Sequence, residues 1–537
     1  MLKLPALLLF VVLFTSLPSP SLSFHDSDDI DHWCSNTPHP EPCRYYLGSN
    51  PHVGIPKDKA QFYQLSLRLA FDLTIRAQSQ LKRRGPACRQ ARERTAWLDC
   101  WKLYDNTVLQ LNRTLDAPHG ACTAFDSQTW LSASLTNLQT CLTGFNDTGA
   151  SSEIIEPVTR YNVSDLISNC LAINRPAAAA ATTNVSATTD RGGVSSWMMI
   201  ANRRLLQLSA SADLVVATDG SGNFRTIKEA FEAAAARMQT GRLSKFVIYV
   251  KAGVYNEYVQ VASSLSNLVM LGDGIGKTII TGSRSVASGY TTLSSATFSK
   301  KLQTHVTFVR RSRMHACITH QSTNTFGPGS QAVALLSASD RSVYYRCSIE
   351  GYQDTLFVYS QRQFFRECDI HGTIDFIFGN AAVVLQRCNI YARLPRHGES
   401  NVITAQGRSD PNQNTGIVIQ FSNIEPAAEL LPVRKTVRSY LGRPWMQYSR
   451  TLFLQSYIDG IIDPAGWLPF AGNFALNTLY YGEFDNTGPG SRMSRRVKWP
   501  GYHVIRRRST VRPFTVGRFI AGRSWIPSTG VPFDPSL

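Results

Sequence analysis

The sequence predicts a chain in two parts, an all-α helical bundle followed by an all-β half built as a parallel β-helix. Three observations support this prediction. Apolar residues recur at helical spacing between residues 58 and 168, short β-branched and aromatic runs separated by turn residues begin near residue 214, and one segment of the second half repeats at a near-constant period. The 537 residues suffice for two or three domains, including one elongated β structure.

Composition excludes several classes of protein. The chain is 43% hydrophobic and 17% charged, which does not fit a collagen-like, coiled-coil or wholly disordered protein. Its formal charge is +17, and the residues after position 208 account for most of it, with 36 basic and 21 acidic side chains. A basic half of this kind favours an acidic partner: a nucleic acid, an anionic membrane or an acidic polysaccharide. Charge alone does not choose among the three.

The N-terminus has the layout of a secretory signal peptide. Lys3 precedes an apolar run over residues 4–17, and the small residue Ser23 marks a cleavage position, so residues 1–23 are expected to be removed. A membrane anchor is the alternative, but the run is shorter than the roughly 20 residues that span a bilayer, and Pro18 follows it. We therefore expect a secreted protein with no membrane segment in its mature form.

Export makes disulfides and N-glycosylation available. Seven of the 11 cysteines precede residue 209, and so do all the Asn-x-Ser/Thr sequons. The predicted glycosylation sites are Asn112, Asn146, Asn162 and Asn184.

The first half is predicted to be helical throughout. Phe62, Leu65, Leu69 and Leu73 recur every three or four residues, which places them on one face of a helix. The same spacing returns around residue 135. We assign residues 24–174 to this helical region.

An Ala- and Thr-rich stretch separates the two halves. Residues 175–208 contain little that could pack, so we interpret them as a linker. The linker ends in the sequence RRLL, and the dibasic pair Arg203 and Arg204 predicts a protease processing site on an exposed segment. A solvated charge pair is the alternative. Residues 209–537 then form the β domain.

Three consecutive segments of the second half align without gaps. They are residues 344–351 (YYRCSIEG), 365–372 (FRECDIHG) and 385–392 (LQRCNIYA). Their cysteines, Cys347, Cys368 and Cys388, are 21 and then 20 residues apart. A period of this size with a β pattern and no helical crossover predicts a parallel β-helix, in which equivalent residues of successive coils lie about 4.8 Å apart.

The repeat places two carboxylates together. Asp354 and Asp375 each stand seven residues after a repeat cysteine, so they should lie side by side on adjacent coils. Two such carboxyl groups alter each other's proton affinity, which lets one be ionised while the other stays protonated. This division suits a nucleophile beside a general acid. The alternative is that both are ordinary turn aspartates.

Neighbouring residues favour the catalytic interpretation. Gln331 and Gln353 offer neutral amide donors for an oxyanion. Arg443 can hold a carboxylate, and Trp445 offers an aromatic face on which a sugar can stack. Together these side chains predict an acyl-transfer site.

The second half resembles the plant pectin methylesterases (pectinesterases) over nearly its whole length. The resemblance rests on nine segments in order: residues 219–222 (DGSG), 247–255 (VIYVKAGVY), 272–274 (GDG), 331–335 (QAVAL), 351–356 (GYQDTL), 375–380 (DFIFGN), 441–445 (LGRPW), 463–467 (DPAGW) and 499–503 (WPGYH). The first half resembles the pectin methylesterase inhibitor family through Cys34 and Cys43, residues 99–104 (DCWKLY) and residues 140–145 (TCLTGF).

The resemblance implies a role for each candidate residue. Asp375 would attack the carbonyl of a galacturonate methyl ester, and Gln331 and Gln353 would stabilise the oxyanion. Asp354 would protonate the departing methanol and then activate water, while Arg443 would keep Asp375 ionised and oriented. The products would be methanol and demethylated pectate.

The resemblance also implies the surroundings of the reaction. It implies a right-handed β-helix, a four-helix inhibitor-like pro-region, a sugar-binding groove lined by Trp445, and no metal or organic cofactor. The expected partners are methylesterified homogalacturonan, the chain's own pro-region or separate inhibitor proteins, and a processing protease, with no nucleic acid. The expected location is the plant cell wall. We further expect the pro-region to cover the groove until the linker is cleaved after residues 203–206.

Disulfide pairing is predicted only in part. The resemblance implies the pairs Cys34–Cys43 and Cys100–Cys141. In the β half, Cys347 and Cys368 lie one coil apart and within disulfide reach, but Cys388 is equally close to Cys368. The sequence leaves four other cysteines without a partner: Cys88, Cys122, Cys170 and Cys317.

Residues 300–336 depart from the family pattern. Residues 309–320 (VRRSRMHACITH) replace a glycine-containing strand, Ser330 stands where the family has His, and Leu336 stands where it has Arg. A distorted coil would misplace Gln331, and a 1 Å misplacement can cost about a hundredfold in rate. A weakened enzyme is therefore one expectation.

Two rival functions are carried forward. A β-helical glycosidase also uses carboxylates about 5 Å apart, and a wall-bound or inhibitory module would use the helical half beside an inactive esterase. Residues 272–278 (GDGIGKT) lack the first glycine of a nucleotide-binding loop, so a β-helix turn is the better interpretation.

Overall fold

The structure is a computed structural model. It describes residues 26–48, 54–116, 123–175, 212–239, 245–262, 265, 267–300, 306–310, 318–323 and 330–537. Several predictions fall outside these residues: the signal peptide, nearly all of the linker with Arg203 and Arg204, the sequon at Asn184, and Cys122 and Cys317. Within the described part of the chain, no helix is long and apolar enough to cross a membrane.

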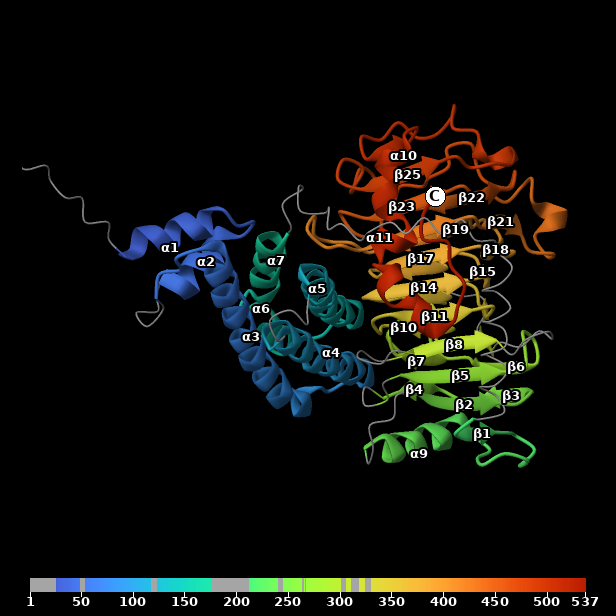
Figure 1. The fold of residues 1–537 in the computed structure, drawn as a ribbon, viewed down its shortest axis with the longest axis horizontal. Helices are drawn as coiled ribbons and strands as arrows, with labels where there is room; N and C mark the ends of the chain where they lie inside the picture. Colours follow the sequence, from blue (N-terminus) through green and yellow to red (C-terminus); the bar gives the residue numbers. More distant parts are fainter. Residues whose placement is uncertain are drawn as a thin grey trace, which may run out of the picture.

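The first half is helical, as predicted. Its helices are α1 (Asp26–Ser35), α2 (Pro40–Gly48), α3 (Lys59–Arg84), α4 (Ala91–Leu115), α5 (Ala124–Thr148), α6 (Ser152–Thr159) and α7 (Val163–Asn174). Asp58 caps α3, and Thr123 and Asp126 form a capping box at the start of α5, which satisfies backbone N–H groups that have no partner within the helix. Figure 1 shows this helical half, in blue and teal, against one side of the β half.

The second half winds into three parallel sheets, which confirms the parallel β-helix. One sheet contains β1 (Leu214–Val216), β2 (Phe246–Val250), β5 (Leu268–Gly272), β8 (Val306–Arg310), β11 (Ser342–Tyr345), β14 (Arg362–Arg366), β17 (Ala382–Gln386), β20 (Gly416–Gln420), β23 (Arg450–Leu454), β25 (Tyr480–Phe484) and β26 (Tyr502–Val504). The second contains β22 (Ser439–Gly442), β19 (Asn401–Gln406), β16 (Ile377–Gly379), β13 (Leu356–Val358), β10 (Leu335–Ser337), β7 (Phe298–Lys300) and β4 (Val259–Val261). The third contains β24 (Tyr457–Ile458), β21 (Asn423–Pro426), β18 (Asn389–Ala392), β15 (Asp369–Gly372), β12 (Ser348–Glu350), β9 (Ile318–Ser322), β6 (Thr278–Gly282) and β3 (Gly253–Asn256).

Helices cover one end and one outer face of the β-helix. Helix α9 (Ile227–Gln239) covers the end near β1, as Figure 1 shows. Helices α10 (Arg508–Val511) and α11 (Val516–Phe519) belong to a C-terminal segment whose apolar residues pack on the outer face of the β1 to β26 sheet.

Stacked isoleucines form the core of the coils. Ile349 pairs with Ile370, Ile370 with Ile390, and Ile390 with Ile424, and all four are fully buried. This ladder confirms the register that the repeat predicts. In-register stacking lets identical side chains fill the interior coil after coil.

One polar residue interrupts this ladder. His320 of β9 pairs with Ile280 on one side and with Ile349 on the other, and it is fully buried beside the ring of Phe298. Burial lowers the pKa of His320 to about 3, so the imidazole is neutral in the folded chain.

A change at His320 should alter the acid sensitivity of the fold. Its folded pKa lies below the value of about 6.5 in the unfolded chain, so its contribution to stability is complete above pH 6.5 and is lost as the pH falls toward 3. We expect this loss to reach about 2 kcal/mol at pH 5. Urea unfolding of residues 209–537 at pH 7.5 and pH 5 should show this loss of unfolding free energy in the wild type and not in His320→Ile. An unchanged pH dependence in the variant would contradict the assignment.

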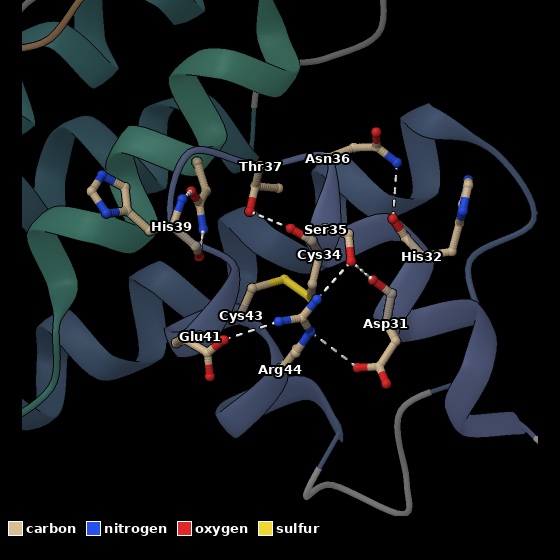
Figure 2. Close-up of a disulfide and its surroundings, with 11 residues drawn as sticks. Asp31, His32, Cys34, Ser35, Asn36, Thr37, His39, Glu41, Cys43 and Arg44 are labelled. Atoms are coloured by element: carbon tan, nitrogen blue, oxygen red, sulfur yellow. Dashed lines mark hydrogen bonds and ion pairs between the residues drawn. A yellow bond between two sulfur atoms is a disulfide. The ribbon is translucent and has the colours of Figure 1, made fainter.

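Two of the predicted disulfides are present. Cys34 joins Cys43 across the α1–α2 hairpin, as Figure 2 shows, and Cys100 of α4 joins Cys141 of α5. Both pairs come from helices that lie against each other, and each bond restricts the unfolded chain.

The pairing of Cys347 with Cys368 is wrong. Cys368 and Cys388 are free buried thiols, whereas Cys347 belongs to a disulfide whose partner is not among the described residues. Cysteines at one position of successive coils have parallel Cα–Cβ bonds about 4.8 Å apart, whereas a disulfide needs its Cβ atoms about 3.8 Å apart. Being one coil apart therefore does not by itself permit a bond. Cys88 and Cys170 are also free.

Three predicted glycosylation sites lie on the surface. Asn112 in α4, Asn146 in α5 and Asn162 before α7 are all exposed. A sequon must be accessible to be modified, so occupancy of these three positions stays a prediction.

Candidate active site

Two aspartates occupy equivalent turns on adjacent coils. Leu356 pairs with Ile377, so Asp354 and Asp375, each two residues earlier, take the same position on successive coils. The backbone N–H of Asp354 donates to the carbonyl of Ile374 at 3.0 Å, which ties the two turns together. Both side chains are nearly buried, with 8% of each residue exposed. The structure thus brings together the pair that the repeat predicts.

The two turns share an unusual backbone. Asp354 and Asp375 have φ angles of 61° and 51°, in the left-handed region that Asp tolerates better than most residues. The glycine before the second turn is needed for space, because a Cβ on Gly372 would lie 2.2 Å from the Cβ of Phe376. The tight turn therefore orients the carboxylate, and a residue larger than glycine at its start would not fit.

Arg443 holds Asp375 through a bidentate contact. Its Nε donates to Oδ1 at 2.8 Å and its Nη2 donates to Oδ2 at 2.6 Å. Burial raises the pKa of Asp375, and the hydrogen bonds and charge of Arg443 oppose that rise. The guanidinium therefore favours the ionised form of this carboxyl group.

No cation of the described residues forms an ion pair with Asp354. Burial raises its pKa well above the ordinary range, and the charge of Asp375 raises it further, while Arg443 offsets only part of the effect. The two carboxyl groups therefore differ: Asp375 favours ionisation and Asp354 favours the protonated form. Such a difference within a pair marks acid and base assignments in known active sites.

The two predicted glutamines flank the pair. The backbone N–H of Ala332 donates to the carbonyl of Gln353, which joins the segments that carry Gln331 and Gln353. The hydroxyl of Ser330 donates to Oε1 of Gln353 at 2.9 Å. With its oxygen engaged in this way, the amide of Gln353 keeps its NH₂ group for another acceptor. Sequence reasoning noted Ser330 only as a departure from the family pattern.

Aromatic side chains lie beside the carboxylates, where Phe357 and Phe378 join the predicted Trp445. Phe357 and Phe378 pair in register and stack with ring centroids 4.2 Å apart. Trp445 lies edge-on to both, at 6.5 and 6.0 Å. Each Phe follows its aspartate by three residues, so the repeat that locates Asp354 and Asp375 also locates this pair.

Leu336 extends the same stack. It pairs with Phe357 and is 3% exposed, within an apolar core that includes Leu103 of α4 and Leu131 of α5. The departure from Arg to Leu at this position therefore contributes apolar surface to the contact between the two halves.

All of the predicted site residues line one cavity of about 300 Å³. From the β-helix these are Gln331, Gln353, Asp354, Asp375, Arg443 and Trp445. The helical half also lines it, with Asp99 and Leu103 of α4 and Thr136, Gln139, Thr140 and Asp147 of α5. The cavity is thus closed on one side by helices that are remote in sequence.

Helix α5 lies between the bundle and the β-helix. Its residues from Asp126 to Leu138 are buried on every face, including several polar ones. The polar residues bond to the β-helix: Asn137 accepts from the hydroxyl of Tyr359 at 3.0 Å, and Thr136 accepts from the amide of Asn380 at 2.8 Å. These pairs satisfy groups that would otherwise be costly to bury.

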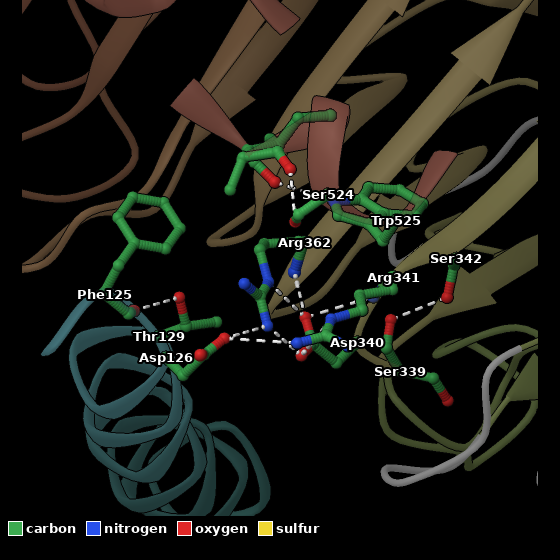
Figure 3. A network of polar contacts seen from close by, with 12 residues as sticks. Phe125, Asp126, Thr129, Ser339, Asp340, Arg341, Ser342, Arg362, Ser524 and Trp525 are labelled. Carbon is green, nitrogen blue, oxygen red and sulfur yellow. Dashed lines mark hydrogen bonds and ion pairs between the residues drawn. The ribbon is translucent and has the colours of Figure 1, made fainter. Parts of the chain in front are cut away.

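A charged network fixes the start of α5 on the β-helix, as Figure 3 shows. Arg362 of β14 donates both to Asp340 at 2.5 Å and to Asp126 of α5 at 2.8 Å, and Arg341 also contacts Asp126 at 3.3 Å. Burial alone would raise the pKa of Asp340, but Arg362 holds it below the ordinary range. Two ion pairs of this network, Arg362–Asp126 and Arg341–Asp126, cross the interface between the two halves.

Residues 300–336, which depart from the family pattern, keep the parallel strand register of the β-helix in the part that the structure describes. Strand β8 pairs with β5 and β11, and strand β9 pairs with β6 and β12. Of the three clustered arginines at residues 310–313, Arg310 ends β8, and the other two lie outside the described residues. The backbone carbonyl of Gln331 accepts from Val286, so the predicted oxyanion donor is anchored on both sides.

Sequence and structure comparisons agree with this architecture. The sequence model of the family Pectinesterase matches residues 213–523, and that of the family Plant invertase/pectin methylesterase inhibitor matches residues 28–173. The chain is 50% identical to Pectinesterase 2 of Citrus sinensis over 98% of each sequence. It is 49% identical to Probable pectinesterase/pectinesterase inhibitor 17 of Arabidopsis thaliana over the full length of both.

A solved structure matches the β half alone. Pectin methylesterase from carrot is 50% identical, with a TM-score of 0.57, and the match covers 61% of this chain and 98% of that one. The parallel β-helix, the helices seated on it and these matches together show that the chain belongs to the pectinesterase family and carries a pectin methylesterase inhibitor domain at its N-terminal end.

Proposed function

We propose that the cavity hydrolyses methyl esters of homogalacturonan through a covalent acyl-enzyme on Asp375. The observation that supports this best is the bidentate contact of Arg443 with Asp375 beside Asp354, whose pKa burial raises well above the ordinary range. Methanol release by residues 209–537, compared with the same segment carrying Asp375→Asn, tests the proposal.

The first step forms the acyl-enzyme. A carboxylate oxygen of Asp375 attacks the ester carbonyl carbon, and the amide groups of Gln331 and Gln353 donate to the oxyanion of the tetrahedral intermediate. When the carbon–methoxy bond breaks, Asp354 gives its proton to the leaving oxygen and methanol departs. The galacturonate carbonyl is then joined to Asp375 as an anhydride.

The second step uses the same groups in reverse. Asp354, now ionised, takes a proton from water, and the resulting hydroxide attacks the anhydride carbon. The bond to Asp375 breaks, which releases a galacturonate carboxylate and restores both aspartates. Trp445 with Phe357 and Phe378 offers an aromatic wall against which the sugar rings can lie.

The basic second half suits this substrate, since each turnover adds a negative charge to the polymer. Because homogalacturonan is a wall polysaccharide, we also propose that the protein is secreted to the cell wall, as the N-terminal signal layout predicts.

The pH profile should reflect the two carboxyl groups. The ionised form of Asp375 is required and burial raises its pKa, so the acid limb of kcat/KM should lie above the ordinary aspartate range. Arg443→Gln removes the group that opposes this rise and should move the acid limb upward by at least about one pH unit. Initial rates of methanol release from pH 4 to 9 measure both limbs. An acid limb unmoved in Arg443→Gln would contradict the role of Arg443.

Ser330 should affect the rate of ester hydrolysis through its hydrogen bond to Gln353. We expect Ser330→Ala to lower kcat about tenfold and leave KM nearly unchanged, because an amide that can rotate stabilises the oxyanion less well. Ser330→Thr keeps the hydroxyl and should restore most of the rate. Equal kcat in Ser330→Ala and the wild type would show that Gln353 needs no such support.

The reaction products distinguish the proposed esterase from the alternative, a glycosidase. An esterase releases methanol and leaves the length of the polymer unchanged, whereas a glycosidase shortens the chain and creates reducing ends. The paired amides and the contact of Arg443 with Asp375 favour the esterase. Size-exclusion chromatography of treated pectin, run beside the methanol assay, decides between them.

We further propose that the helical half keeps the esterase silent until the linker is cut after residues 203–206. The lining of the cavity by α4 and α5 and the shared apolar core support this proposal. A processing protease acting at Arg203 and Arg204 would separate the halves covalently, and the enzyme would become active once the bundle leaves.

A further inference from the structure

A second cavity, of about 220 Å³, lies at the contact between the two halves. Three arginines line it: Arg175, which follows α7; Arg408, which follows β19; and Arg450, which begins β23. Phe125 and Gln128 of α5 complete its wall on the helical side. None of these residues lines the cavity that holds Asp354 and Asp375.

No carboxylate among the described residues forms an ion pair with the three guanidinium groups. Arg408 is 5% exposed and donates to backbone carbonyls, at 2.9 Å to Gln413 and 3.3 Å to Tyr448. The nearby carboxylate of Asp410 is already engaged by the hydroxyl of Ser168 and the backbone N–H of Asn412. The charge of Asp410 therefore compensates only part of the positive charge that the three arginines bring to the cavity.

N–H donors also remain in the cavity. A guanidinium has five N–H groups, and the guanidinium of Arg450 donates one of them to the backbone carbonyl of Thr415 at 3.2 Å. Arg175 is exposed at the end of α7, where its backbone N–H donates to the carbonyl of Ala172, and its guanidinium has no hydrogen bond to the described residues. Several donors can therefore converge on one small acceptor.

The electrostatics of the cavity favour a negative ligand. Burial and the charge of Arg450 lower the pKa of Arg408 to about 8, and burial with the charge of Arg175 lowers that of Arg450 to about 10. The lowered pKa values mean that burial and mutual repulsion destabilise the charged guanidinium groups. An anion bound between them would reduce this electrostatic destabilisation. Arginine pairs best with planar or tetrahedral oxyanions.

We propose that this cavity binds an oxyanion, supplied either as a free inorganic ion or as the carboxylate of a uronate residue. The volume admits a phosphate or a single sugar acid. Because Arg175 belongs to the helical half and Arg408 and Arg450 to the β-helix, the bound anion would join the two halves. The site is separate from the esterase chemistry, so it stands or falls independently of the proposed function.

Binding to the intact two-part chain tests the site. Isothermal titration with sodium phosphate and with trigalacturonate, at ionic strength held constant with sodium chloride, should give saturable binding of at least one probe. The double variant Arg175→Gln/Arg450→Gln should raise the Kd at least tenfold. The matched control Arg434→Gln removes an exposed arginine outside the cavity and should leave the Kd unchanged.

Each outcome decides the question. Phosphate binding that the double variant weakens identifies a free oxyanion as the ligand, and trigalacturonate binding that it weakens identifies a uronate. Absence of binding by both probes, or equal binding by the wild type and the double variant, overturns the proposal. If the double variant melts early, Arg175→Gln alone, at an exposed position, provides the same comparison.

Discussion

Replacing Asp375 with Asn should abolish methanol release by residues 209–537, with a rate at least about 10⁴-fold below that of the unaltered segment. The amide has no ionised oxygen to attack the ester, and it cannot accept two charge-assisted hydrogen bonds from Arg443. The solved chain of the carrot enzyme is covered over 98% of its length by a match to 61% of this chain.

A neighbouring aspartate provides the matched control. Asp369 lies on β15, accepts from the side chain of Asn389 at 2.8 Å and does not line the cavity. Asp369→Asn is the same chemical change one strand away and should keep nearly full activity. Methanol release by Asp375→Asn within tenfold of the wild type would exclude Asp375 as the nucleophile.

The unaltered segment itself tests the non-enzyme alternative. If folded residues 209–537 release no methanol while the helical half suppresses another pectin methylesterase, the chain acts as an inhibitory module. The family matches do not favour that outcome.

Much of the site follows from one repeat in the sequence. Three cysteines at spacings of 21 and 20 residues define the coil, and counting seven residues onward places Asp354 beside Asp375. This works because parallel coils stack in register, so position in the repeat becomes position in space. The same count, extended by three residues, reaches Phe357 and Phe378, whose stacking was not predicted.

Other features of the structure could not be located by counting along the repeat. The repeat places Cys347 and Cys368 one coil apart, but this proximity does not decide disulfide pairing, and Cys368 is a free thiol. The seating of α5 depends on complementarity between surfaces that are distant in sequence. Its Ser, Thr and Asn residues are typical of a solvated face, yet they are buried against β-helix loops.

The intact chain should release methanol at least tenfold more slowly than residues 209–537. Helices α4 and α5 line the cavity that holds Asp354 and Asp375, and we expect them to obstruct a polymeric substrate. Because the two halves are joined, the bundle acts at a high effective concentration until the linker is cut. Cleavage followed by separation of the halves should restore the full rate. Equal activity of the intact and cleaved chains would refute the blocking role.

Asp126 allows this blocking role to be tested without cutting the chain. Asp126→Asn removes the charge that Arg362 meets across the interface, while Arg362 keeps its pair with Asp340 and the new side chain can still cap α5 through its oxygen. Looser docking of the bundle should raise methanol release by the intact chain several-fold. Asp72→Asn, at an exposed position on α3, is the matched control and should change nothing. An unchanged rate in the intact Asp126→Asn chain would show that the charge of Asp126 does not hold the bundle over the cavity. Removal of a charge that contributes to docking must weaken the docking of the bundle and so expose the cavity more often.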